Sequence, residues 1–107
     1  MEVYTLNRRL QLQAKLENLI QSQHVYFQPP ASVRLVYPCV VYTIGEGDVK
    51  RANDSIYQYV NSYTLTFRYK QPNIDIIEKV LKEFEMCKLN TTYCSENLNH
   101  YVFTVYY

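Results

Sequence analysis

The stretch Tyr63-Thr64-Leu65-Thr66-Phe67-Arg68-Tyr69 decides the fold, because large apolar side chains alternate in it with polar ones. Successive side chains of a strand point to opposite faces of a sheet, so this alternation predicts a strand with one buried and one solvated face. The strand is expected to begin near Ile56, and Gln71-Pro72-Asn73 ends it. Other segments of the chain must therefore pack against its apolar face.

Two other segments carry apolar residues at helical spacing. From Leu6 to Ile20 and from Ile74 to Phe84, apolar residues recur at steps of three and four, with charged residues mostly between them. This spacing places the apolar residues on one stripe of a helix. Both segments are therefore predicted to be amphipathic helices.

Short apolar runs predict the other strands, namely Val25–Phe27, Arg34–Thr43, about Leu89–Cys94 and His100–Tyr106. Pro38 stands in the middle of the second run and has no N–H to donate, so an edge or a bulge is expected there. The segment Ile44–Asn53 holds both glycines and four charged residues, which is typical of a long loop.

The order of the predicted elements indicates the fold class. A helix followed by strands, and a second helix followed by strands, predict an α+β protein. We expect a single domain over residues 1–107, with a single mixed, mainly antiparallel β-sheet and two α-helices packed on one face.

The composition favours a protein that makes surface contacts. The net charge is +1, whereas domains that follow nucleic-acid phosphates usually carry a clear basic excess. Twelve tyrosines supply rigid faces with polar tips, which suit half-buried sheets and protein interfaces. Neither an apolar run of about 18 residues nor a secretory signal is present, so no membrane is expected. Three cysteines, an odd number, predict reduced thiols in a protein made in a cytosol.

No residue pattern indicates catalysis, a metal or a cofactor. Cys39 lies within an apolar run, and no serine has the glycine neighbours of a nucleophile elbow, so no enzyme is expected. Cys87, Cys94 and His100 lack the spacing of zinc ligands. The glycine pair of Gly45-Glu46-Gly47-Asp48 comes with two carboxylates, which would repel a phosphate.

Single-stranded nucleic acid is the alternative ligand. Aromatic strands close to basic residues would in principle form a stacking platform. The alternation of the aromatic residues with polar ones favours a place in the core instead. The residues in question are Tyr63, Phe67, Tyr101 and Phe103, with Lys50, Arg51, Arg68 and Lys70 as the basic ones.

Three segments carry a resemblance to a known family, namely Val25-Tyr26-Phe27-Gln28-Pro29-Pro30, Leu35-Val36-Tyr37-Pro38-Cys39-Val40-Val41-Tyr42 and Asn97-Leu98-Asn99-His100-Tyr101-Val102-Phe103. Ala52-Asn53-Asp54 looks like the polar loop of the same family. With these segments in this order, the chain resembles the small tail-completion proteins of long-tailed bacteriophages, variously called tail terminator, minor capsid or neck proteins.

The resemblance implies a structural virion subunit made in the host cytoplasm and located at the head–tail junction. Such a subunit is expected to form a ring, typically a hexamer, that caps the tail tube and joins it to the head connector. The implied partners are further copies of the chain, the tail tube protein and a head-side connector or stopper protein, with DNA at most passing through the lumen. A neck adaptor or head-completion subunit is the related alternative.

The expected ring also indicates which segments form the contacts between subunits. One surface of each copy must meet a different surface of the next copy. The charges of both signs in and just after Ile44–Asn53 make that segment the first candidate for a subunit contact or the lumen, and the tyrosine-rich strand Ile56–Tyr69 is the second. The candidate residues are Glu46, Asp48, Lys50, Arg51, Asp54, Tyr57 and Tyr59.

Overall fold

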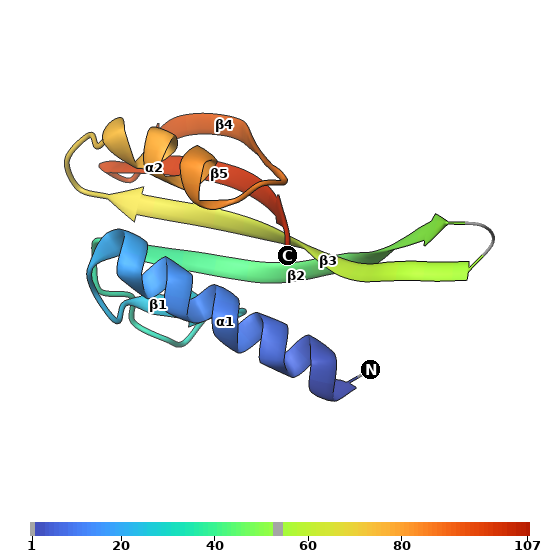
Figure 1. Ribbon diagram of the computed structural model, residues 1–107. Coiled ribbons are helices and arrows are strands. Elements are labelled where there is room, and N and C mark those ends of the chain that lie inside the picture. The colour runs from blue at the N-terminus through green and yellow to red at the C-terminus, as the bar shows by residue number, and fades with distance from the viewer. Residues whose placement is uncertain (1, 53–54) are drawn as a thin grey trace.

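The computed structural model describes the backbone of residues 2–52 and 55–107, and the side chains of residues 8–45 and 62–107. Two helices and five strands follow one another along the chain (Figure 1). They are α1 (Glu2–Ile20), β1 (Val25–Phe27), β2 (Cys39–Ala52), β3 (Ser55–Tyr69), α2 (Asp75–Glu83), β4 (Cys87–Ser95) and β5 (Leu98–Tyr106).

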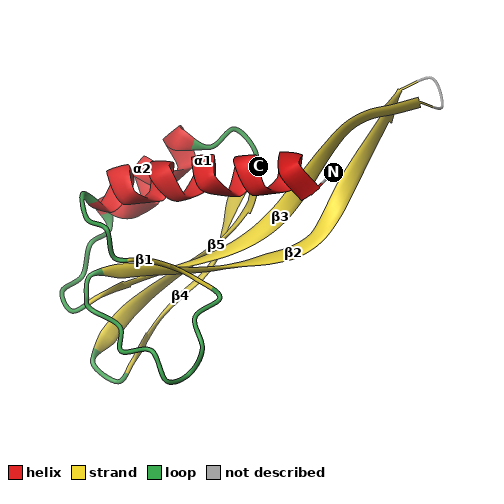
Figure 2. Cartoon of the chain, turned by 90° about the horizontal axis from the view of Figure 1, so that it is seen from below, coloured by secondary structure: helices red, strands yellow, loops and turns green. Residues whose placement is uncertain are grey.

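The strands form one sheet in the order β1-β2-β3-β5-β4. β1 pairs with β2 in parallel, and the remaining pairs are antiparallel. Figure 2 shows α1 and α2 on the same side of this sheet. The predicted fold class, an α+β protein with a mixed, mainly antiparallel sheet covered on one face by two helices, is therefore confirmed.

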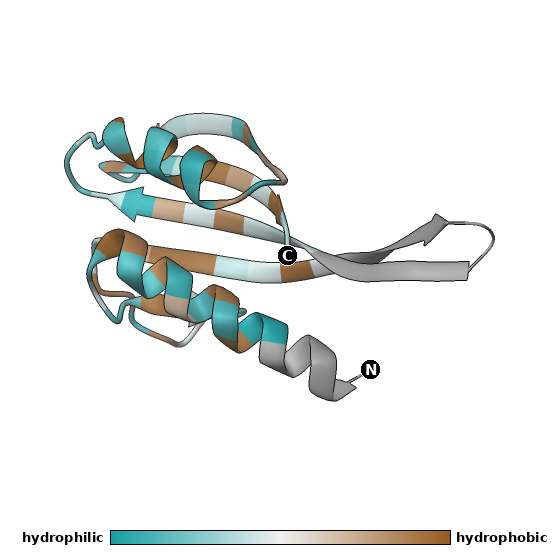
Figure 3. Cartoon of the chain, in the orientation of Figure 1, coloured by the Kyte–Doolittle hydropathy of each residue, from teal (hydrophilic) through white to brown (hydrophobic). Residues whose placement is uncertain are grey.

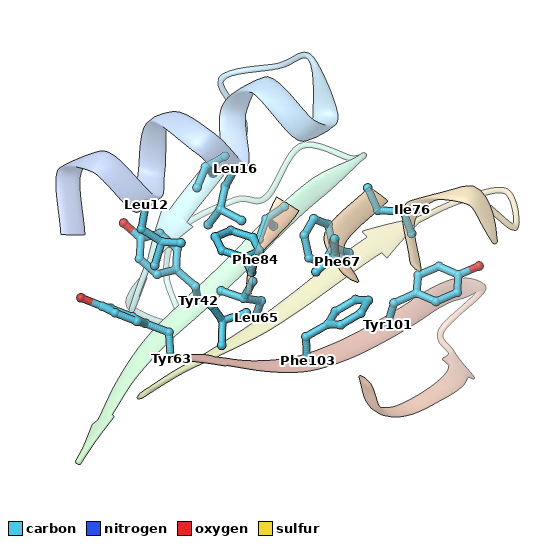
Figure 4. Packing of buried hydrophobic residues seen from close by; sticks show 14 residues of the cluster. Leu12, Leu16, Tyr42, Tyr63, Leu65, Phe67, Ile76, Phe84, Tyr101 and Phe103 are labelled. Atoms are coloured by element: carbon cyan, nitrogen blue, oxygen red, sulfur yellow. The ribbon is translucent and has the colours of Figure 1, made fainter. Parts of the chain in front are cut away.

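The core lies between the helices and the inner face of the sheet, and Figure 4 shows its side chains. Leu65 of β3 stands at its centre, paired with Tyr42 of β2 on one side and Phe103 of β5 on the other. All three side chains are fully buried. Phe67 and Phe84 are buried in this core as well.

A hydrogen-bond network around Tyr42 fixes α1 on the sheet. The Tyr42 hydroxyl donates to Gln13 Oε1 at 2.7 Å and accepts from Arg9 Nη1 at 3.2 Å. The Arg9 guanidinium also lies 4.5 Å from the centre of the Phe27 ring. Burial raises the pKa of Tyr42, so the phenol stays protonated and able to donate at neutral pH. α1 is thus attached by polar contacts as well as by its buried leucines.

Gln21 ends α1 without a glycine. Its φ of 52° is left-handed, the Gln21 N–H donates to Asn18 O at 3.3 Å, and the Ser22 N–H donates to Glu17 O at 3.1 Å. These two bonds form a Schellman motif, which satisfies carbonyls that the helix leaves free. The chain then turns directly into β1.

The predicted strand Arg34–Thr43 is wrong in its first half. β2 begins at Cys39, immediately after Pro38, and residues 28–38 form a connection across the sheet. Pro38 has no N–H for a strand ladder, so pairing starts only after it.

The predicted loop Ile44–Asn53 is also wrong, because β2 continues through this segment to Ala52. Ile44 pairs with Tyr63 and Gly47 with Asn61, so two residues of β2 oppose Ser62 alone. This is a β-bulge, and it absorbs the glycine-rich sequence without ending the strand. A Cβ at Gly45 would lie 2.7 Å from Ser62 Oγ, so a larger residue at this position would require the Ser62 hydroxyl to move.

We predict that Phe67→Ala and Phe84→Ala each lower the free energy of unfolding by about 3–5 kcal/mol, since each removes a buried ring and leaves a cavity. Urea denaturation followed by circular dichroism measures the loss. Leu10→Ala is the control, because the Leu10 side chain is 50% exposed on α1. A loss below about 1 kcal/mol for both phenylalanine variants would contradict this description of the core.

Candidate assembly surface

A two-stranded arm extends from the sheet beyond the end of β5. The last pair between β3 and β5 is Ser62 with Tyr106, and nearer the tip the described parts of β2 and β3 pair only with each other. Figures 1 and 2 show this ribbon leaving the body of the molecule, whose principal-axis extents are 49 × 28 × 22 Å. We call the segments 45–52 and 55–61 the arm.

The arm brings together the residues predicted to form a subunit contact. Asp48 pairs with Val60, and Tyr59 pairs with Val49. The candidates that the arm contains are Glu46, Asp48, Lys50, Arg51, Tyr57 and Tyr59. Asp54 lies outside the described residues, and so do the side chains of the other six. The expected loop and the expected strand are thus two sides of one hairpin.

A second irregularity falls within the arm. Lys50 pairs with Gln58 and Arg51 with Ile56, which leaves Tyr57 as the extra residue of β3. Bulges of this kind bend a strand and increase its twist. The arm therefore contains two β-bulges, one at its base and one near its tip.

The aromatic residues considered for nucleic-acid stacking belong to the core. Tyr63, Phe67 and Phe103 are fully buried, and Tyr101 is 6% exposed. Phe67 and Phe103 contact each other edge-to-face, with ring centres 5.6 Å apart. The interpretation of these rings as core residues is confirmed, and none of them offers a face on which a base could stack.

A row of polar side chains crosses the outer face of the sheet, opposite the helices. Arg68 pairs with Cys39 on one side and with His100 on the other, and His100 pairs with Tyr93. The His100 and Tyr93 rings stack at 4.5 Å, and His100 Nδ1 lies 3.2 Å from Leu98 O. Sequence reasoning missed this row, since its members come from four strands whose order only the fold reveals.

Arg68 is a member of that row with a buried polar atom that lacks a partner in the described part of the chain. Its Nε is buried and has no hydrogen-bond partner among the described residues. It lines a hollow of about 340 Å³ beneath the connection between β1 and β2, together with Gln28, Val33 and Thr43. A guanidinium can bind a carboxylate or a phosphate.

The cysteines are placed differently from one another. Cys39 is fully buried, and burial raises the pKa of its thiol to about 11. Cys87 is partly buried, which also raises its thiol pKa, and Cys94 is exposed. Within the described residues, no three His, Cys, Asp or Glu side chains gather in a way that could hold a metal ion.

A hollow of about 260 Å³ lies where α1 and α2 meet the C-terminal end of the chain. Lys15 Nζ bonds to Glu83 Oε2 at 3.0 Å across it, and the Arg8 guanidinium lies 3.9 Å from the centre of the Tyr107 ring. Arg8, Lys15 and Glu83 thus already contact neighbours within the fold. The hollow therefore fits a role in holding the two helices and the last residue together.

We predict that a maleimide at about pH 8 modifies Cys94 of the native protein and spares Cys39, because the thiolate is the reactive form and the buried thiol stays protonated. Peptide mass spectrometry after a short exposure identifies the labelled residue. After denaturation both cysteines should react. Equal labelling of both in the native protein would contradict the burial of Cys39.

None of the described helices is long and apolar enough to cross a membrane. Comparison with protein-family models, with curated proteins and with solved structures found no match to this chain.

Proposed function

We propose that this chain is a structural subunit of the head–tail junction of a tailed bacteriophage. Copies of it form an oligomeric ring, typically of six, that caps the tail tube and joins it to a head-side connector or stopper protein. The chain acts by contact and not by catalysis, and DNA at most passes through the lumen. It is made in the host cytoplasm and ends in the neck of the virion.

The arm is the observation that carries this proposal. A two-stranded hairpin alone in water is marginally stable, so a projecting one gains stability from a partner. An arm also gives each copy a surface distinct from its body, as a heterologous ring requires. The charges of Asp48 and Arg51 on this arm can set the register and the choice of partner.

The resemblance to tail-completion proteins supplies the partners in this proposal, and the fold is compatible with them. A neck adaptor or a head-completion subunit would use the same arm against other proteins. The single-strand-binding alternative loses its main support, since the rings on which it depended are in the core. Only salt-dependent binding through the remaining basic residues would restore it.

We predict that reversing two arm charges, Asp48→Arg with Arg51→Asp, leaves the fold intact and weakens ring formation by at least about tenfold, equivalent to about 1.4 kcal/mol. The arm projects beyond the last pair of β3 with β5, so circular dichroism and the melting temperature should not change. Light scattering after size exclusion measures the oligomer. In an infection, the variant should give filled heads and tails that fail to join.

The control exchanges the charges of an ion pair in the body, Lys15→Glu with Glu83→Lys. This pair links α1 and α2 and remains oppositely charged after the exchange. Ring formation should be unaffected. Normal virions from the arm variant would remove Asp48 and Arg51 from the interface, and a wild-type protein that stays monomeric beside tail and connector proteins would contradict the ring.

A further inference from the structure

Exposed apolar side chains are frequent along α2 and β4. Among the described side chains, eight large hydrophobic ones are exposed and five of them fall within the segment 74–93, of which only Tyr93 lies on the outer face of the sheet, stacked on His100. Ile74 is 72% exposed and Leu81 is 45% exposed. Clusters of this kind on a small protein mark an interaction site more often than single exposed residues do. The five are Ile74, Leu81, Met86, Leu89 and Tyr93.

The helical contribution to this cluster is a stripe beside the buried one. Ile74, Ile77 and Leu81 follow at steps of three and four, while Ile76 and Val80 face the core. The flank of α2 that carries Glu83 faces α1 through the ion pair with Lys15. The stripe therefore lies on the side of α2 that is turned away from α1.

The stripe stands over β4. Ile74 and Ile77 surround a hollow of about 450 Å³ together with Thr92, Tyr93 and Cys94 of β4. Leu89 and Thr92 of β4 pair with Phe103 and Tyr101 and so face the helix side of the sheet, yet both are exposed. The stripe and this side of β4 thus form one uncovered surface at the end of the sheet.

β4 is the last strand on this side. It pairs with β5, and no strand of the described chain occupies its other edge, whose backbone groups are free to pair. Lys88 and the bulge at Asn90, which lies between the pairs of Leu89 and Thr91, interrupt the first half of this edge. The second half, Thr91–Ser95, is regular and uncharged, and it lies at the hollow below α2.

We propose that this edge receives the arm of a second copy, which adds to the sheet beside Thr91–Ser95 and lies below the stripe of Ile74, Ile77 and Leu81. Backbone hydrogen bonds would hold the added strand, and the apolar stripe would cover its inner side chains. The inference rests on the proposed function and deepens it by naming the surface that each copy offers to the arm of the next.

Three features of the arm make it the occupant. The segment Ser55–Asn61 of β3 has a free edge beyond its pairing with β5, and it is long enough to span Thr91–Ser95. Its sequence contains Ile56, Tyr57, Tyr59 and Val60, which are apolar or aromatic residues suited to a strand. Figure 1 shows the arm and β4 on different sides of the molecule, as a heterologous contact requires.

The test uses three variants of the full chain. The edge variant, Ile74→Lys with Leu81→Lys, places charge on exposed positions and leaves the buried stripe of α2 intact. The armless variant removes residues 46–60 and joins Gly45 to Asn61 in a short turn. The matched control is Leu10→Lys, because Leu10 on α1 is 50% exposed and Leu81 is 45% exposed. Circular dichroism and melting curves confirm that each variant is folded.

Light scattering after size exclusion should show oligomers for the wild type and for Leu10→Lys. The edge variant and the armless variant should each associate at least about tenfold more weakly, because each lacks one half of the contact. An equimolar mixture of the two should form a complex of two chains, since the intact arm of one fits the intact edge of the other.

The contrary outcomes separate the two proposals. A mixture that stays monomeric, an armless chain that assembles like the wild type through β4 alone, or a wild type that is monomeric at high concentration overturns the pairing of arm and edge. Oligomers that respond to these variants as expected, in a phage whose heads and tails join normally without this chain, would instead overturn the proposed function and leave the pairing standing.

Discussion

Burial of one face of β3 sets the position of every other element in this protein. Tyr63, Leu65 and Phe67 on the inner face of the strand are fully buried. β2 and β5 must therefore pair with it in the register that aligns Tyr42 and Phe103 with Leu65. A shift of one residue would turn each apolar side chain toward water. The helices follow from the same constraint, because only α1 and α2 can cover that face.

The strands of the sheet differ in length, and this difference produces the arm. β3 has fifteen residues and β5 has nine, so β3 runs beyond its support and carries β2 with it into the arm. At the other side of the sheet, β4 is exposed along most of its length and lies beside the exposed stripe of α2. The arm and this uncovered edge are the two surfaces that the proposed contact brings together.

The sequence predicts what depends on local periodicity and misses what depends on distant pairing. The alternation around Leu65 and the helical spacing near Val80 predict buried faces that the structure contains. The segment Ile44–Asn53 looks like a loop, because nothing local shows that β3 pairs with it and that a bulge absorbs its glycines. The spacing of Ile74 in the sequence is that of a core residue. Its exposure could not be predicted locally, because it depends on which flank of α2 faces α1.

The arm and the edge also bear on how an assembly of this chain would close. In the proposed contact, Lys88 and the bulge at Asn90 would limit the receiving edge to its second half, which would oppose the open-ended sheet growth that free edges permit. In such an assembly, each copy would be rotated relative to the previous one by an amount that depends on the angle between the arm and β4. A fixed rotation between copies generates a ring when successive rotations add up to a full turn. Strand twist and the two bulges of the arm set that angle. Copy number in such a ring would therefore be determined by the backbone of the arm more than by any single side chain.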